Sequence, residues 1–535
     1  MMSENGSEKK GLFWTPKGGN NAESFWASCH VFSSVTDNKE TGKTERTTIV
    51  VDMGQNEAPQ NFEGGKYQKV VPALDDCLAV PGCKAPESEA SAVFLTHAHS
   101  DHINAVFEYL AMGARLPEIY GSDYTIKTLE KGFLDRGIKR KDWPKVKTIK
   151  AGDKIQLGSM TVEAFTASHS IPGCFSFKIS DENASIFHSG DTKADETSFL
   201  GNGVDMNAYD KIGRVDLMTF DATATNMDGH AAYEAEVFDG YQKLFKENAD
   251  KQIVAVLPAA HMERLATVIS AAAAAGKDVL INGSASMDQN ILALKMGGYD
   301  LQEKCPDIRV VSAYSKEADS VDPKRCITIT NGIYGEADSP FIRKLLGEKS
   351  DFVLSENAVV IAPTTGRKSE RVESLMKNAP AGVAFITARD ADIYGSGHAQ
   401  KDDFIEIAGH IRPATVASIH CTGGMAEEFD RLVAGCGYKT LSERPYNGCT
   451  VSVGKDECRI VSVKEPAWFG INHHKQADGS EKIEFSRRED NGFSSEKTRN
   501  SLKERQEKAS QKIAAFRREN SLKKALLFKR SGHGR

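Results

Sequence analysis

The sequence has no long apolar run. In its 535 residues, no window approaches the roughly 18 consecutive apolar side chains that a membrane-spanning helix needs. The first residues, MMSENGSEKKGLFWTP, also lack the apolar segment of a secretory signal. We therefore expect a cytoplasmic protein with no membrane partner.

Paired cysteines are absent as well. The chain has 10 cysteines, but none of them belongs to a CxxC pair. This spacing argues against a disulfide framework and against a cysteine-based zinc ribbon. We interpret the cysteines as reduced thiols.

The composition is that of a large globular enzyme, with 40% hydrophobic and 27% charged residues. The length suggests three to four domains, or one large domain with an insertion. The net charge is -6, but residues 496–535 contain thirteen Lys and Arg against four Glu, so this segment carries +9 and the remainder -15. Such an arm is typical either of a protein with a polyanionic partner or of a solvated helix.

Polar residues follow several short apolar segments of the first half. TTIVV precedes Asp52, AVFL precedes Thr96, and SIFH precedes Ser189-Gly190-Asp191. From about Val215 the pattern changes to strands alternating with helices, which is typical of a parallel sheet covered by helices. We expect a return to the first domain after residue 395.

The strongest motif is THAHSDH at Thr96 to His102, at the end of an apolar strand. His97 and His99 are two positions apart, so they lie on the same side of an extended segment. The chain then turns so that Asp101 and His102 face the same cavity. Nitrogen and carboxylate ligands in this mix suit Zn or Mn at catalytic sites that keep a position open for water.

His169, Asp191 and His420 lie at later strand ends. Together with the THAHSDH motif they resemble the metallo-β-lactamase superfamily in its two-metal form. The resemblance implies an α/β fold, namely an αββα sandwich, and two divalent ions, Zn²⁺ in the first instance, with Mn²⁺ or Mg²⁺ as alternatives. It also implies that His97, His99 and His169 hold one ion, that Asp101, His102 and His420 hold the other, and that Asp191 bridges them.

The block between Asp191 and His420 resembles the β-CASP insertion, which marks the nucleic-acid-processing branch of that superfamily. FDATATN with Asp221, the segment Ser396-Gly397-His398-Ala399, and Ile419-His420 carry the resemblance. Within the branch, the chain is similar to the ribonuclease J family over roughly residues 45–455. The expected divisions are a metallo-β-lactamase domain at 1–214 and 396–472, a β-CASP domain at 215–395, and a basic, helical tail at 473–535.

This resemblance predicts a metal-dependent ribonuclease that acts on single-stranded RNA as a 5′–3′ exonuclease, an endonuclease or both. It implies that Asp101 or Asp191 orients the attacking water and that His398 contacts or protonates the leaving 3′ oxygen. Substrate binding would involve Asp221, Ser396, Gly397, His398 and Ala399. A DNA nuclease, a di-metal ester or lactone hydrolase and a binding protein without catalysis remain alternatives, and a homodimer is left open.

Two segments depart from the ribonuclease J pattern. The helix-leading segment that ends in His-Arg in the family is here Ala260-His261-Met262-Glu263-Arg264, and Gly283 to Met287 (GSASM) lacks an expected Arg. Dependence on a 5′-monophosphate is therefore left open. A further candidate RNA surface is the basic segment Arg136 to Lys150, in which Trp143 could stack on a base.

Overall fold

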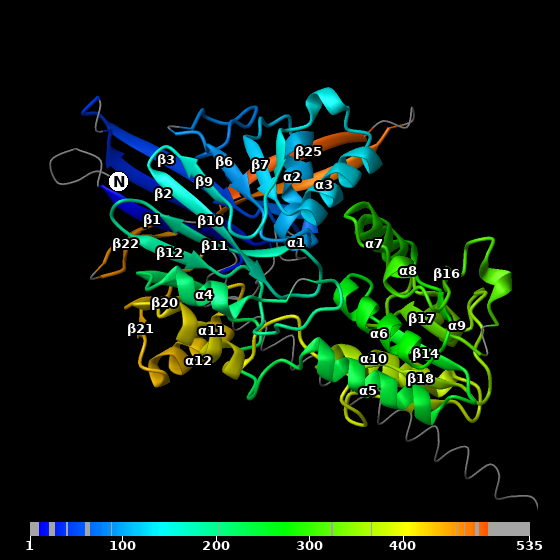
Figure 1. Ribbon diagram of the computed structural model, residues 1–535. Coiled ribbons are helices and arrows are strands. Elements are labelled where there is room, and N and C mark those ends of the chain that lie inside the picture. Colours follow the sequence, from blue (N-terminus) through cyan, green and yellow to red (C-terminus); the bar gives the residue numbers. More distant parts are fainter. Residues whose placement is uncertain are drawn as a thin grey trace, which may run out of the picture.

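The computed structural model describes residues 10–489 apart from 21–26, 39–40, 59–64, 87, 202, 323–324, 365, 456, 465 and 477–480. Figure 1 shows two parts, one built on two large sheets and the other a smaller α/β part around a third sheet. Among the described residues, none of the helices has the length and apolar character that crossing a bilayer requires.

Two sheets of the first part pack face to face. The first has eight strands, in the order β23 (Arg459–Val463), β22 (Cys449–Val453), β1 (Gly11–Gly18), β2 (Cys29–Asp37), β3 (Thr44–Val51), β6 (Ala92–Phe94), β7 (Glu118–Gly121) and β8 (Val146–Thr148). The second has seven, in the order β21 (Lys439–Thr440), β20 (Thr415–Ile419), β13 (Leu217–Asp221), β12 (Ser185–His188), β11 (Cys174–Ser180), β10 (Met160–Ala167) and β9 (Lys154–Leu157). Phe32 and Phe94 from one sheet meet Phe177 and Ile186 from the other in a shared apolar core.

Helices cover the outer faces of both sheets. The eight-stranded sheet carries α1 (Ser100–Ile103), α2 (Ala105–Ala111) and α3 (Asp123–Asp135), and the short helix η2 (Arg140–Asp142) follows α3. The seven-stranded sheet carries α4 (Met206–Ile212), α11 (Lys401–Ile411) and α12 (Gly423–Gly435). This is the αββα sandwich that the sequence predicted.

The inserted part is a parallel six-stranded sheet. Its strand order is β16 (Val310–Ser312), β15 (Val279–Ile281), β17 (Ile327–Asn331), β14 (Ile253–Leu257), β18 (Val359–Ile361) and β19 (Ala384–Ile386). All five side chains of β14 are buried, as expected for a parallel strand with both faces covered. The helices around it are α5 (Glu234–Glu247), α6 (Met262–Ala274), α7 (Ala285–Met296), α8 (Leu301–Lys304), α9 (Pro340–Leu345) and α10 (Gly366–Leu375), with the short turns η3 (Ala318–Ser320) and η4 (Met376–Asn378).

Two expected divisions need correction. We expected the insertion to begin at residue 215, but β13 pairs in parallel with both β12 and β20 of the first part, so the chain leaves that sheet only after Asp221. We also expected a helical tail from residue 473. Instead, β24 (Ala467–Lys475) and β25 (Glu481–Glu489) form a hairpin that joins β5 (Lys69–Pro72) and β4 (Asn56–Glu57) in a fourth sheet.

The hairpin forms because its apolar residues alternate, which places them on one face of the sheet. Ile471 of β24 and Ile483 and Phe485 of β25 pack into the core beneath α2 and α3. Residues 490–535, which hold most of the predicted basic tail, lie outside the described residues.

Candidate metal centre

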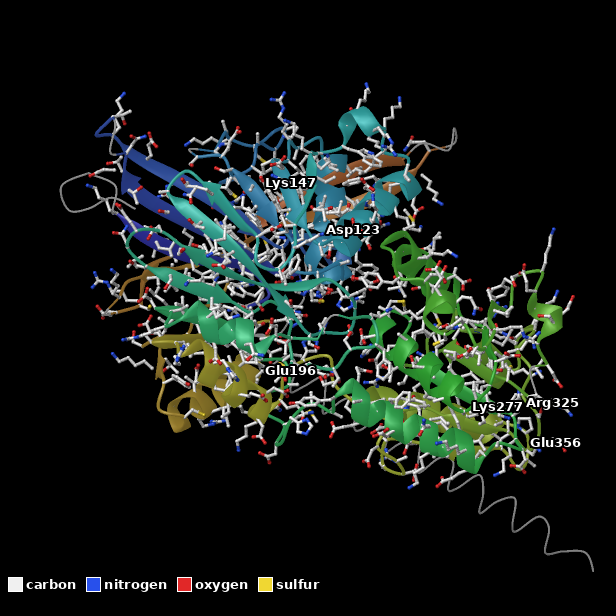
Figure 2. The ribbon with its side chains drawn as sticks, viewed as in Figure 1. Asp123, Lys147, Glu196, Lys277, Arg325 and Glu356 are labelled. Atoms are coloured by element: carbon white, nitrogen blue, oxygen red, sulfur yellow. The ribbon has the colours of Figure 1, made fainter. Side chains whose placement is uncertain are left out.

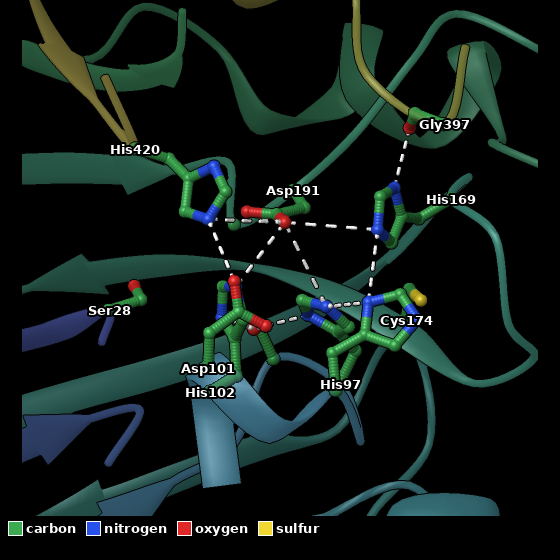
Figure 3. Close-up of polar contacts among 12 residues, drawn as sticks. Ser28, His97, Asp101, His102, His169, Cys174, Asp191, Gly397 and His420 are labelled. Atoms are coloured by element: carbon green, nitrogen blue, oxygen red, sulfur yellow. Dashed lines mark hydrogen bonds and ion pairs between the residues drawn. The ribbon is translucent and has the colours of Figure 1, made fainter. Parts of the chain in front are cut away.

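The histidines and aspartates singled out in the sequence converge at one end of the two sheets (Figure 3). His97 follows β6, His169 follows β10, Asp191 follows β12 and His420 follows β20. The loop after β3 passes close to this cluster, and a Cβ atom at Gly54 would lie 1.8 Å from the carbonyl oxygen of Asp101. The glycine of VVDMG is therefore required by close backbone contact.

Three histidines form one potential ligand set. His97 Nε2 lies 2.9 Å from His99 Nδ1, and His169 Nε2 lies 3.2 Å from the same atom. All three ligand atoms lie within 4.8 Å of one another.

A second set consists of Asp101, His102 and His420. His420 Nε2 lies 3.4 Å from Asp101 Oδ2. Asp191 stands between the two sets, because its Oδ2 lies 3.3 Å from His102 Nε2, 3.7 Å from His420 Nε2, 3.8 Å from His169 Nε2 and 3.9 Å from His97 Nε2. Its carboxylate is thus in reach of both sets.

The other ring nitrogen of each histidine is held by a polar neighbour. His102 Nδ1 lies 2.8 Å from Asp52 Oδ2, and His169 Nδ1 donates to the carbonyl of Gly397 at 2.5 Å. The remaining partners are Thr96 Oγ1 for His97 (3.0 Å), Ser170 Oγ for His99 (3.2 Å) and Thr223 Oγ1 for His420 (2.8 Å). Such partners fix the ring orientation, and when the neutral ring carries its proton on the outer nitrogen, the inward nitrogen is free to bind a metal.

The electrostatics of the cluster suit a cation. Burial and the neighbouring histidines lower the pKa of His97 and His169, and that of His99 to about 4, so these rings are neutral. Burial opposes a charge on His102, but Asp191, Asp52 and Asp101 outweigh it and raise the pKa of His102. The cluster therefore favours a positive charge among its carboxylates.

The hydrogen bonding of the buried polar atoms also supports a cation site. Among the described residues, the buried Asp191 Oδ1 has no hydrogen-bond partner, and the buried His102 Nε2 has only its 3.3 Å ion-pair contact with Asp191 Oδ2. Ring nitrogens 2.9 to 3.2 Å apart would also face one another lone pair to lone pair, unless a cation lies between them. The donor set fits divalent ions that accept nitrogen and carboxylate ligands, such as Zn²⁺ or Mn²⁺.

His398 borders this cluster without belonging to either three-residue set. Its Nδ1 lies 2.7 Å from Asp221 Oδ2, and its ring stacks on His420 with 5.4 Å between centroids. Burial disfavours the charged ring, but the Asp221 carboxylate outweighs burial and raises the pKa of His398 to about 9. Asp191, Asp221, His398 and His420 also lie close enough to form an alternative ligand group.

Two predicted substrate-binding residues do not face the cleft. Asp221 is fully buried behind His398, and Ala399 is fully buried with its N–H donating to the Thr192 carbonyl at 2.7 Å. Both side chains are therefore buried next to the loop that carries His398. Ser396, Gly397 and His398 do line the cleft.

The cleft has a volume of about 740 Å³ and runs between the two parts of the chain. One wall comes from α2 and α3, with Asn104, Phe107 and Arg136, and the facing wall comes from α7, with Gln289 and Asn290. In Figure 1, α3 and α7 lie side by side where the two parts meet.

The departing segment Ala260 to Arg264 borders the cleft, but its polar groups are engaged within the protein. Arg264 is only 2% exposed and pairs with Glu234, while His261 Nδ1 caps α6 by accepting from the Arg264 N–H at 3.0 Å. Ser286 of the GSASM segment lines the cleft, so this wall is polar where an arginine was expected.

Trp143 does not offer a free face to a base. Its Nε1 donates to the Ile138 carbonyl at 2.9 Å, its ring centroid lies 5.0 Å from that of Phe133, and Arg140 stands 5.0 Å over it. The indole is thus occupied by contacts with other side chains of the protein.

Sequence reasoning missed several residues that hold the site. Thr223 lies within the motif FDATATN, and Ser170 directly follows His169, but neither position reveals its partner. Asp403 of α11 was not recognised either, although its carboxylate accepts from the N–H groups of Ala194, Ala231 and Gln400. An acidic residue at the third position of a helix is the only signal that could have pointed to it.

Comparison with known proteins gives consistent results. The sequence model of the Beta-lactamase superfamily domain matches residues 75–256. Ribonuclease J from Mycolicibacterium smegmatis is 27% identical over 339 residues, which are 62% of this chain and 59% of that protein. Ribonuclease J2 from Bacillus subtilis is 26% identical over 357 residues, which are 65% of this chain and 61% of that protein.

The chain thus spans about 60% of the length of the curated relatives it matches. Among solved structures, a protein of unknown function from Enterococcus faecalis V583 superposes with a TM-score of 0.56 at 16% identity, covering 83% of this chain and 100% of the other. That likeness supports the fold. Together with the ligand geometry, these comparisons show that the chain is similar to ribonuclease J over about 60% of its length and has the metallo-β-lactamase fold with an inserted α/β part.

Proposed function

We propose that this chain is a metal-dependent ribonuclease that hydrolyses phosphodiester bonds of single-stranded RNA. The observation that carries the proposal is the position of Asp191, whose Oδ2 lies within 3.9 Å of histidine nitrogens from both ligand sets. A carboxylate in that position is suited to bridge two divalent ions, with Zn²⁺ best matched to the ligands and Mn²⁺ or Mg²⁺ as alternatives.

Bound in these sets, two divalent ions would lower the pKa of a water molecule towards 7 and neutralise the charge of the scissile phosphate. His97, His99 and His169 would hold one ion, and Asp101, His102 and His420 would hold the other. Asp101 and Asp191 would orient the attacking water through their carboxylates. The five histidine rings cannot rotate freely, because each is tied to a polar neighbour through its outer nitrogen.

His398 is the residue we assign to the leaving group. Its side chain is 23% exposed, which leaves one edge of the ring open to the cleft, and its Nδ1 is held by Asp221. In the reaction the water loses a proton to solvent, its oxygen bonds to phosphorus, and the bond from phosphorus to the 3′ oxygen breaks. A proton from His398 goes to that oxygen, and the ring then regains a proton from solvent. The protonated ring also places a positive charge beside the phosphate.

The open cleft between the two parts supports both modes of cutting. A strand could thread past the metal centre for internal cleavage, or enter by its end for 5′–3′ exonuclease cleavage. The polar but uncharged α7 wall offers no cationic side chain from Ser286, Gln289 or Asn290 for a 5′-phosphate. We therefore propose that cleavage does not depend strictly on a 5′-monophosphate.

The test uses the full chain with Zn²⁺, Mn²⁺ or Mg²⁺ and 3′-labelled single-stranded RNA and DNA that carry a 5′-monophosphate, 5′-triphosphate or 5′-hydroxyl. Wild type and Asp250→Ala, which changes an exposed carboxylate, are expected to cut RNA, and Asp191→Ala is expected to lose cleavage while still binding RNA. Undiminished cleavage by Asp191→Ala would refute the two-metal site. Cleavage of small esters or lactones without any cleavage of RNA would refute the proposed substrate.

A further inference from the structure

The segment that follows α3 is the most basic stretch among the described residues near the cleft. Residues 136–150 contain seven Lys and Arg and one Asp, on a chain whose net charge is -6. All seven cationic side chains are exposed. We call these seven side chains the basic ridge, and Lys147, which belongs to it, is labelled in Figure 2.

The basic ridge is continuous with the cleft. Lys131 and Arg136, at the end of α3, line the cleft together with His99 and Asp101 of the metal centre. The guanidinium of Arg136 lies 3.9 Å from the ring centroid of Phe107, which lines the same wall. Arg136 therefore stands where the cleft opens onto the ridge.

The ridge differs from α3 in how its charges are used. On α3, Lys127 pairs with Glu130 at 2.9 Å and Lys131 pairs with Asp135 at 2.5 Å. In the part of the chain that the structure describes, Lys139, Lys141 and Lys145 form no ion pair with a carboxylate. Their charges are therefore available to an external anion.

The ridge is also anchored to the fold. Arg140 stands 5.0 Å over the half-buried Trp143, and Lys147 stands 5.7 Å over Tyr120 of β7. Trp143 in turn packs on Phe133 of α3. These aromatic contacts fix the path of residues 136–150 beside the cleft, so the ridge keeps a defined direction relative to the metal centre.

We propose that the basic ridge binds the phosphates of the single-stranded RNA segment that emerges from the cleft, beyond the nucleotides at the metal centre. This inference rests on the proposed ribonuclease function. Most of the surface of an acidic protein repels RNA. The exposed cations at the cleft opening attract its phosphates, so the RNA is expected to leave the cleft along the basic ridge. Phosphate contacts of this kind add affinity without sequence preference and depend strongly on salt.

The test removes three exposed charges that pair with no carboxylate in the described part of the chain. The triple variant Lys139→Gln, Lys141→Gln, Lys145→Gln is compared with the wild type and with a control triple, Lys304→Gln, Lys316→Gln, Lys344→Gln, whose lysines are exposed on the inserted part. Binding of a 25-nucleotide and a 5-nucleotide RNA is measured by fluorescence anisotropy in EDTA, over a range of salt concentrations. Cleavage of both RNAs is measured separately with metal.

We expect the ridge triple to bind the long RNA roughly tenfold more weakly at low salt. We also expect the slope of log Kd against log salt to fall by about 2, since each lost phosphate contact on a single strand accounts for about 0.7. Cleavage and binding of the 5-nucleotide RNA should remain at the wild-type level. The control triple should match the wild type on both RNAs.

Three outcomes overturn the proposal. If the ridge triple equals the control triple on the long RNA while the wild type cleaves both RNAs, the ridge has no role and the ribonuclease function stands. If the short and long RNAs are weakened equally, the lysines act inside the cleft. If the wild type neither binds nor cleaves RNA, the ribonuclease function fails and the ridge proposal fails with it.

Discussion

Arg264 and Glu234 form a bidentate ion pair inside the inserted part, with Nε 3.0 Å from Oε2 and Nη2 2.9 Å from Oε1. The same guanidinium donates to the carbonyl of Gly395 at 3.2 Å, directly before the loop that carries His398. Gly397 of that loop accepts the hydrogen bond from His169. One buried arginine thus links α5 and α6 to the loop at the metal centre.

Removing only one partner of this ion pair should lower the free energy of unfolding more than removing both. Arg264→Met leaves the buried Glu234 carboxylate with the more distant Lys193, 3.5 Å away, and we expect a loss of about 3–5 kcal/mol in the free energy of unfolding. The double variant Glu234→Gln, Arg264→Met should lose less. Urea unfolding of the three proteins measures this, and equal losses would show that charge pairing is not the cause.

Asp52 should control the metal affinity of the second ligand set. In Asp52→Asn, an amide N–H would face His102 Nδ1, so the ring would turn its lone pair outward and its proton towards the metal. Loss of a hydrogen-bond partner of this kind typically weakens metal binding by about 10- to 100-fold. Competition with a chelator measures the affinity, with Asp250→Asn as the exposed control; unchanged affinity would mean that Asp52 is structural only.

His398 should affect the rate without affecting metal content. If it acts on the leaving group, His398→Ala lowers kcat by about 10²- to 10⁴-fold, and the protein still binds two ions. Asp221→Asn should lower kcat in the same direction, because its side chain holds His398 Nδ1 at 2.7 Å. The metal content and the kcat of each variant are measured together. Loss of one ion in His398→Ala would place His398 among the metal ligands instead.

Glu263 should make stability depend on pH. Burial and the nearby Glu234 raise the pKa of Glu263 from 4.5 to about 7, so the folded protein binds this proton more tightly than the unfolded chain. The resulting stabilisation is complete below pH 4.5 and is lost as the pH rises through about 7. Glu263→Gln cannot lose this proton, so its free energy of unfolding relative to wild type should rise between about pH 5 and pH 8.

Urea unfolding at the two pH values tests this prediction. In Glu263→Gln, the new amide oxygen would retain the hydrogen bonds that Glu263 Oε1 accepts from Ser198 and Leu200. Glu303→Gln, at an exposed position, is the control. A parallel pH profile for Glu263→Gln and wild type would contradict the assignment.

The sandwich could be predicted from the resemblance to the metallo-β-lactamase superfamily. The convergence of the proposed ligands could be predicted because His97, His169, Asp191 and His420 each follow an apolar strand, and such strand ends meet at one edge of a sheet. The residues that hold the ligands could not. Thr223 meets His420 across 197 positions of sequence, and Gly397 meets His169 across 228, so no local pattern records either contact. The strand pairing of β25 was also missed, because its polar composition hid the alternation of Ile483 and Phe485.

The buried surroundings of Trp143 were missed for a related reason. An aromatic residue within a basic segment is compatible both with base stacking and with packing, and only the position of Phe133 decides between them. The same applies to Arg264, whose buried partner Glu234 lies 30 positions away.

The two ligand sets differ in when their last member is synthesised. His97, His99 and His169 all precede the insertion, whereas Asp101 meets His420 across 319 positions of sequence. A nascent chain therefore carries the complete first set while the whole insertion is still to be made, and the second set closes only when β20 emerges. If the proposed function is correct, ribonuclease activity therefore begins only after the whole insertion and β20 have been synthesised.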